Sequence, residues 1–144
     1  MIRLSRLTDY AVTLLSLMGK AGSDKLWTAP DLTEKAGLPP PTVAKVLKLL
    51  AKSGIVSAQR GASGGYRLTR AQNQISIAEI VEAMDGPIAI TDCTEGSAHS
   101  TCTIERICPM SGGWNKVNRA VRKALEDVSL AEMNALPLHF AEGE

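Results

Sequence analysis

The sequence predicts a mostly helical fold: a winged helix-turn-helix with a two-stranded wing, followed by a long C-terminal helix. Three observations predict it. Two helical segments flank a turn that contains Gly37, a glycine-rich loop separates two β-like runs directly after them, and an apolar stripe with spacings of three and four residues starts at Trp114. With 144 residues and 3% aromatic residues, we expect one domain with a short accessory unit and an aliphatic core.

The first two helices are predicted from apolar spacing and end signals. Residues 5–20 carry apolar side chains at helical intervals and precede a glycine-containing segment. Thr28 suits the N-cap of a second helix, because Pro30 is tolerated in a first turn and Asp31 is favourable near a positive helix end. This short helix is expected to end at Gly37, as left-handed C-caps do.

The third helix is expected to begin near Pro41, because proline is excluded from helix interiors but fits a first turn. It covers residues 41–52 and has one apolar and one polar face. The apolar face holds Val43, Val46, Leu47 and Leu50, and the polar face holds Thr42, Lys45, Lys48 and Lys52. A short helix, a glycine turn and a second helix with a basic outer face indicate a helix-turn-helix.

Residues 55–60 and 66–69 are expected to form two strands, joined by a loop at 61–65 with enough glycine for positive φ angles. A hairpin directly after a helix-turn-helix is a wing, with Arg60 at its tip.

In the second half of the chain, Ser76 and Glu79 form a capping box that opens another helix. The apolar stripe at Trp114, Val117, Val121, Ala124 and Val128 has a heptad-like spacing. We expect it to pair with a second copy of the chain, the alternative being packing against its own domain. A short final helix is expected at 129–135.

The predicted parts are a winged helix-turn-helix at 1–70, a connecting helix at 71–90, a cysteine loop at 91–112, a dimerisation helix at 113–136 and a loose tail at 137–144.

The charge is divided unevenly between the halves. Residues 1–70 hold eleven Lys or Arg against four Asp or Glu, a balance of +7, whereas residues 71–144 hold five against eleven, a balance of −6. A basic winged helix is expected to bind double-stranded DNA, although winged helices also serve as protein-interaction modules. The candidate DNA-binding residues are Thr28, Pro40, Thr42, Lys45, Lys48, Arg60, Ser63 and Gly64.

Cys93, Cys102 and Cys108 are the three cysteines of the chain, with the spacing C-x8-C-x5-C. Three thiolates on one loop form an incomplete site for a soft metal such as zinc or copper(I), or for an iron–sulfur cluster. An odd cysteine count argues against a disulfide framework. The alternative is that these cysteines are structural or incidental.

The chain resembles the IscR/NsrR-type family of winged-helix iron–sulfur transcription regulators, and most of all the regulators of the SUF assembly system. The resemblance rests on the string LSRLTDYAV at residues 4–12, the wing string RGASGGY at 60–66 and the cysteine loop before a long helix. It covers about residues 1–135. It implies a homodimer crossed at the long helix and a 2Fe–2S or 4Fe–4S cluster on the loop of each subunit.

The resemblance leaves the fourth cluster ligand open. In IscR-type members a histidine follows the last cysteine by three positions, and here that position is Ser111. In NsrR-type members an aspartate from the partner subunit ligates the cluster in a context that matches Thr8-Asp9-Tyr10, which makes Asp9 one candidate. His99, inside the cysteine loop, is the alternative.

Together these features lead us to expect a DNA-binding transcriptional regulator. We expect a repressor that senses iron–sulfur cluster status, binds a palindromic operator as a dimer and controls cluster-assembly genes. The rivals are a zinc- or thiol-redox-responsive regulator on the same fold and, from another class, a cluster carrier or electron-transfer protein. No nucleophile–base constellation or phosphate-binding loop indicates an enzyme. The sequence shows no secretory signal and no apolar run of membrane-spanning length, so the cytoplasm is the expected compartment.

Overall fold

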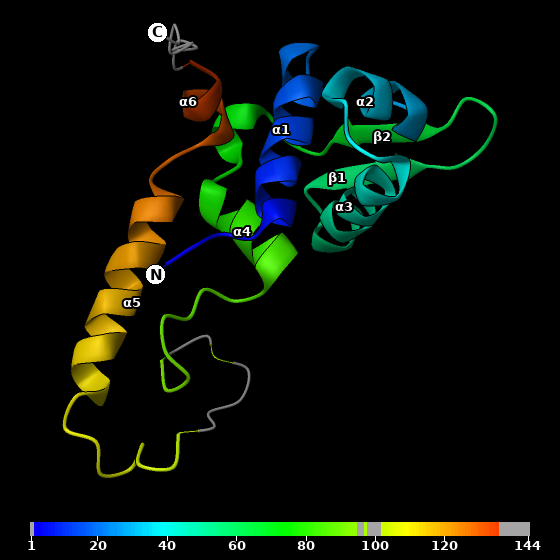
Figure 1. Cartoon of the computed structure of the whole chain (residues 1–144). Coiled ribbons are helices and arrows are strands. Elements are labelled where there is room, and N and C mark those ends of the chain that lie inside the picture. Colours follow the sequence, from blue (N-terminus) through cyan, green and yellow to red (C-terminus); the bar gives the residue numbers. More distant parts are fainter. Residues whose placement is uncertain (1, 95–96, 98–101, 136–144) are drawn as a thin grey trace, which may run out of the picture.

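The computed structural model describes residues 2–94, 97 and 102–135, with the side chain of residue 111 excepted. The elements follow in the order α1 (Arg6–Lys20), α2 (Ala29–Ala36), α3 (Pro40–Ser53), β1 (Val56–Gln59), β2 (Gly65–Leu68), a 3-10 turn η1 (Gln72–Gln74), α4 (Ile77–Asp85), α5 (Ser111–Glu126) and α6 (Leu130–Ala135). The predicted fold class, a mostly helical winged helix-turn-helix with a two-stranded wing, is confirmed. The wing and α5 lie at opposite ends of the molecule (Figure 1).

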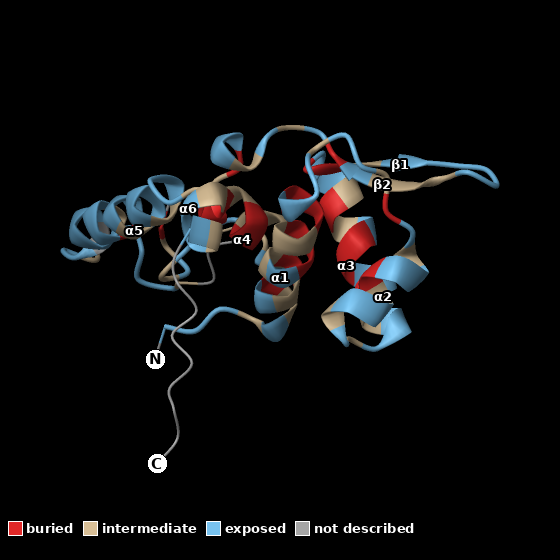
Figure 2. Ribbon diagram, turned by 90° about the horizontal axis from the view of Figure 1, so that it is seen from above, coloured by how far each residue is buried: buried red, intermediate tan, exposed pale blue. Residues whose placement is uncertain are grey.

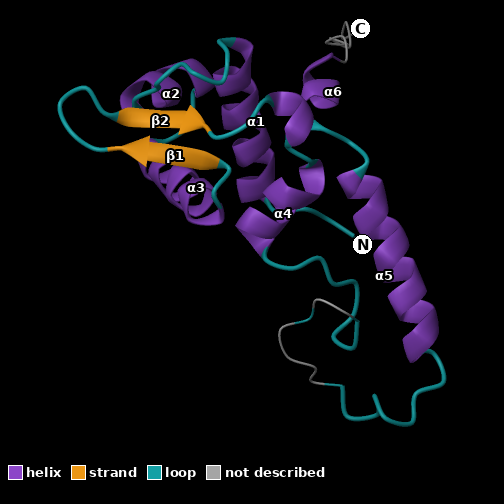
Figure 3. Ribbon diagram, turned by 180° about the vertical axis from the view of Figure 1, so that it is seen from behind, coloured by secondary structure: helices purple, strands orange, loops and turns teal. Residues whose placement is uncertain are grey.

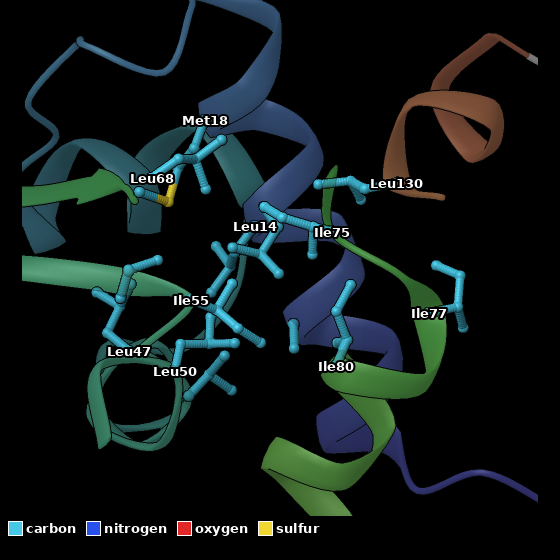
Figure 4. Packing of buried hydrophobic residues seen from close by; sticks show 14 of the residues in the cluster. Leu14, Met18, Leu47, Leu50, Ile55, Leu68, Ile75, Ile77, Ile80 and Leu130 are labelled. Carbon is cyan, nitrogen blue, oxygen red and sulfur yellow. The ribbon is translucent and has the colours of Figure 1, made fainter. Parts of the chain in front are cut away.

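The core lies where α1, α3, α4 and the hairpin meet. Leu14, Leu47, Leu50 and Ile80 are completely buried there, and Leu130 of α6 packs against the same cluster. Figure 4 shows these side chains converging from several elements. In contrast to α1, α3 and α4, most of α5 is exposed (Figure 2).

The ends of the helices follow from local hydrogen bonds. Ser5, Thr28 and Ser76 cap α1, α2 and α4, and each side-chain oxygen accepts a hydrogen bond from a backbone N–H three positions on. The capping box predicted at Ser76 is confirmed by both of its bonds. Gly37 ends α2 in the left-handed conformation with φ of 65°, as predicted.

The hairpin is antiparallel, with Val56 opposite Leu68 and Gln59 opposite Gly65. Its second strand makes a further pairing that the sequence does not predict. Trp27 and Tyr66 exchange two backbone hydrogen bonds of 2.7 Å, so the segment before α2 pairs with β2 through an isolated bridge.

The segment predicted as the dimerisation helix, residues 113–136, contains two helices and not one continuous helix. Helix α5 begins at Ser111 and ends at Glu126, and α6 is the separate short helix expected at 129–135. Between them the chain is bonded to the segment before α4, because the N–H of Ile77 donates to Val128 and the N–H of Leu130 donates to Ile75. Within the described part of the chain, none of the helices combines the length and apolar character needed to cross a lipid bilayer.

Candidate nucleic-acid interface and cysteine loop

Helix α3 presents a basic face to solvent. Its opposite side is fixed in the core by Val43, Val46, Leu47 and Leu50. The exposed side carries Lys45, Lys48 and Lys52, at intervals of three and four residues that place them on one face. Near the start of the helix Pro40 is exposed and Thr42 is half-buried. This arrangement matches a recognition helix, whose first turns and outer face are the parts that reach base edges and phosphates.

The beginning of α2 lies beside the wing. Thr28 is exposed, and its hydroxyl accepts a 3.2 Å hydrogen bond from the N–H of Asp31. The ammonium group of Lys25 lies 3.9 Å from the centre of the Trp27 ring, a cation–π contact. Trp27 itself is buried, and its indole N–H has no hydrogen-bond partner among the described atoms. Sequence reasoning did not include Lys25 or Trp27 in this surface.

The wing tip projects away from the helices (Figure 3). Arg60 and Ser63 are exposed there, and Gly64 is partly buried in the turn. A Cβ atom on Gly64 would lie 2.2 Å from the carbonyl oxygen of Gln59, so only glycine fits at this position. The glycines therefore set the shape of the tip and leave the side chains of Arg60 and Ser63 directed outward as candidate groove contacts.

The cysteine loop connects α4 to α5 (Figure 1). Cys93, Cys102 and Cys108 are free thiols and each is partly buried. The sulfur of Cys93 lies 3.4 Å from the hydroxyl oxygen of Thr91. The alternative ligand His99 lies outside the described residues.

The predicted ligands are not gathered at one point. Among the described residues, no group of three or more His, Cys, Asp or Glu side chains is close enough to hold a metal ion. Asp9 is exposed in the first turn of α1, where its carbonyl accepts a hydrogen bond from Thr13. The donor set still fits an iron–sulfur cluster in kind, since three unpaired thiols lie on one loop. To bind a cluster, the loop would have to move so that the three thiols come together, and a fourth ligand would be needed.

Two polar side chains that the sequence did not single out hold the segment before this loop. Asn118, in the middle of α5, has 3% exposure, accepts a 2.9 Å hydrogen bond from the N–H of Ile90 and donates one of 3.1 Å to the carbonyl of Ile88. The signal that could have revealed it is an asparagine directly after Val117 in the heptad-like stripe.

Asp85 is the second such side chain. At the end of α4, its carboxylate accepts hydrogen bonds from the hydroxyl of Thr8 at 2.8 Å and from the N–H of Ser5 at 3.3 Å. Burial acts to raise the pKa of Asp85, but the hydrogen bonds from Ser5 and Thr8 outweigh it, so the pKa lies below its usual value. These bonds fix the turn of α1 that carries Asp9.

Helix α5 has an uncovered apolar face. Trp114 and Val117 are 42% and 43% exposed. Nearby, a cleft of about 360 Å³ lies between the N-terminal segment, the end of α4 and α5, with Ile2, Pro87 and Leu125 in its walls. Arg122 holds α5 against α4 through an ion pair of 3.2 Å with Glu82. A tryptophan and a valine exposed on the same helix are typical of a contact surface.

Comparisons with known proteins agree with this architecture. A family model described as Rrf2, iron-dependent transcriptional regulator, matches residues 4–135. A protein of Mycobacterium tuberculosis, provisionally named an HTH-type transcriptional regulator, is 30% identical over 98% of this chain and 88% of its own length.

Two solved structures have the same fold. CymR, the global cysteine regulator of B. subtilis, is similar with a TM-score of 0.68 and 19% identity, over 93% of this chain and 97% of that one. IscR of T. potens is similar with a TM-score of 0.65 and 24% identity, over 99% of this chain and 94% of that one.

Proposed function

Since the chain belongs to the Rrf2 family of DNA-binding transcriptional regulators, we propose that it is a repressor that senses iron–sulfur cluster status and controls cluster-assembly genes. The cluster would be held by Cys93, Cys102 and Cys108. The observation that carries the proposal is their position: three free thiols lie on the single loop that joins the DNA-binding half to α5.

The DNA-binding surface is proposed to consist of the outer face of α3, the start of α2 and the wing tip. Lys45, Lys48 and Arg60 supply the positive charge, and they lie in the half of the chain with a balance of +7. Thr42, near the start of α3, is placed for a phosphate or base contact, and Pro40 fixes the entry of the helix. Thr28, Ser63 and Gly64 complete the surface on either side.

The uncovered face of α5 supports a homodimer in which Trp114 and Val117 contact the same helix of a second copy. In such a dimer two α3 helices must lie about 34–36 Å apart to reach successive major grooves of a palindromic operator. A change in the angle between subunits therefore changes DNA affinity. A coupling of about 1–3 kcal/mol between loop and DNA is enough for a useful switch.

When bound, the cluster would supply sensitivity to iron supply, to oxidation and to nitric oxide. The chain's own part would be to bring the thiols of positions 93, 102 and 108 together on the loop that precedes α5. The fourth ligand is proposed to be Asp9 of the partner subunit, with His99 as the alternative. A compartment in which thiols stay reduced, the cytoplasm, is consistent with this role.

The proposal is tested by an anaerobic gel-shift experiment. Reconstituted and cluster-free protein are compared on the promoter of the protein's own operon, with a Cys93→Ala, Cys102→Ala, Cys108→Ala variant as the control. We expect the affinities of the two wild-type forms to differ at least about tenfold, the equivalent of 1.4 kcal/mol. Equal affinities, or a variant that still responds to reconstitution, would contradict the sensing role.

A zinc- or thiol-redox-responsive regulator on the same fold is the second candidate. The observation in its favour is that the three thiols are free and separate in the described structure. An absorption spectrum of anaerobically purified protein distinguishes the two. Charge-transfer bands with equivalent iron and sulfide favour the cluster, whereas a colourless protein with stoichiometric zinc or reversible disulfides favours the second candidate.

A further inference from the structure

Asn118 is an unusual residue in α5. Among the side chains that the structure describes in this helix, it is the one that is fully buried, with 3% exposure. An apolar residue would pack at such a position without needing partners, whereas a buried amide must be hydrogen-bonded. Both ends of the Asn118 amide are bonded to the backbone of the segment that leads into the cysteine loop, at Ile88 and Ile90.

A local turn with its own hydrogen bonds contains the first cysteine. The carbonyl of Thr91 accepts bonds from the N–H of Thr94 at 3.1 Å and from its hydroxyl at 2.8 Å. Thr94 is buried with 4% exposure, and the hydroxyl of Thr91 lies 3.4 Å from the sulfur of Cys93. The turn from Thr91 to Thr94, which contains Cys93, thus follows directly after the segment that Asn118 bonds to α5.

Cys102 and Cys108 follow later in the loop, and Cys108 lies three positions before the start of α5. The hydrogen bonds described around them are local turns, such as the N–H of Glu105 to Cys102 at 3.4 Å and the N–H of Ile107 to Ile104 at 3.0 Å. Among the bonds described, those of Asn118 attach the Cys93 end of the loop to α5.

We propose that Asn118 is a positioning residue for the cluster site: through Ile88 and Ile90 it holds the backbone before Cys93 at a fixed place on α5 before a cluster is bound. This inference rests on the proposed function. It also gives the loop a direct mechanical connection to the helix with the uncovered apolar face. A ligand that is already held loses less conformational freedom when it binds.

The test compares Asn118→Leu, which has a similar size and removes both bonds, with Asn118→Asp, which keeps the acceptor for Ile90 and loses the donor to Ile88. Lys116→Gln, an exposed substitution on the same helix, is the control. Hydrogen exchange of residues 88–94 and the alkylation rate of each cysteine by iodoacetamide are measured by mass spectrometry on cluster-free protein. Cluster loss to a chelator is followed by absorbance on reconstituted protein.

We expect Asn118→Leu to accelerate exchange at Ile90 and alkylation of Cys93, with Cys102 and Cys108 unchanged. Cluster loss should be about tenfold faster, in the range found when residues that orient metal ligands are replaced. Asn118→Asp should change the same quantities in the same direction, because it places a carboxylate beside the carbonyl of Ile88, and it carries the test if the leucine variant does not fold. The control should match wild type.

Two results overturn the inference without touching the proposed function: Cys93 alkylation and cluster loss as in wild type, or equal acceleration of all three cysteines, which would indicate general loosening. If wild-type protein takes up neither iron nor sulfide, the proposed function fails and the positioning role fails with it. Each outcome is recognised by a different measurement.

Discussion

The carboxylate of Asp85, at the end of α4, accepts a 2.8 Å hydrogen bond from the hydroxyl of Thr8, which lies 77 positions earlier in the first turn of α1. Thr8 has 1% exposure whereas Asp85 is exposed, so this bond joins a buried side chain to one that contacts solvent. It connects the helix that enters the cysteine loop to the turn that carries Asp9. The stability of this junction can be measured directly.

Replacing Asp85 by Asn removes the charge but keeps an acceptor for Thr8. We expect the free energy of unfolding to fall by about 1 kcal/mol at neutral pH, at the low end for charged hydrogen bonds because Asp85 is largely exposed. The folded pKa of Asp85 is below its ordinary value of 3.8, so its contribution is present above that value and lost as the pH falls through the folded pKa.

Urea unfolding of cluster-free protein at a series of pH values checks this expectation. The curves of wild type and Asp85→Asn should differ at neutral pH and converge in acid. Curves that stay parallel through the acidic range would show that the ionised form of Asp85 does not stabilise the fold. Asp24→Asn, at an exposed position in the turn after α1, is the control.

Replacing Lys48 by Ala should weaken DNA binding with little dependence on operator sequence if the side chain contacts phosphate. The slope of log affinity against log salt concentration should become shallower by about 0.9 for each phosphate that the variant no longer neutralises. Lys116→Ala, on the exposed part of α5, is the control and should leave the slope unchanged. An unchanged slope in Lys48→Ala would remove this residue from the proposed surface.

Gly65→Ala should disturb the wing at the start of β2. A Cβ atom there would lie 2.4 Å from the carbonyl oxygen of Trp27, within the pairing of Trp27 with Tyr66. Forcing the backbones apart should cost about 1–3 kcal/mol of stability and shift the fluorescence of the buried tryptophan. Ala62→Ser, at the exposed tip, should change neither quantity. Wild-type stability in Gly65→Ala would show that the pairing adapts without cost.

Val117→Glu should disrupt the proposed dimer, because it places a charge in the centre of the uncovered apolar face. Sedimentation velocity should show a smaller species than wild type, and affinity for a palindromic operator should fall while a half-site is bound as before. Lys116→Glu introduces the same residue one position earlier and should leave the assembly intact. If Val117→Glu sediments like wild type, the dimer contact lies elsewhere.

The elements could be predicted from the sequence because their signals are local. The caps at Thr28 and Ser76 and the glycine after α2 depend on hydrogen bonds that span a few residues, and each is found where the spacing placed it. The break between α5 and α6 is also close to its expected position, since Ser129 and Glu132 cap the last helix within one turn.

The contacts between distant segments could not be predicted in this way. The pairing of Trp27 with Tyr66 and the bonds of Asn118 to Ile88 and Ile90 depend on how the helices pack, and no periodicity encodes them. Cysteine spacing correctly placed three thiols on one loop between two helices, but spacing does not fix the path of a loop. The distance between the thiols therefore lay beyond sequence reasoning.

The pairing at Trp27 bonds the wing to the segment that enters α2, so backbone hydrogen bonds join the wing to the helix-turn-helix. We therefore expect each DNA-binding half to make the same contacts with its half-site in every state of the protein. In the proposed dimer, a signal would then act on the separation and tilt of the two DNA-binding halves. A signal that acts in this way would change the number of base pairs preferred between the two half-sites. The bases preferred within each half-site would stay the same.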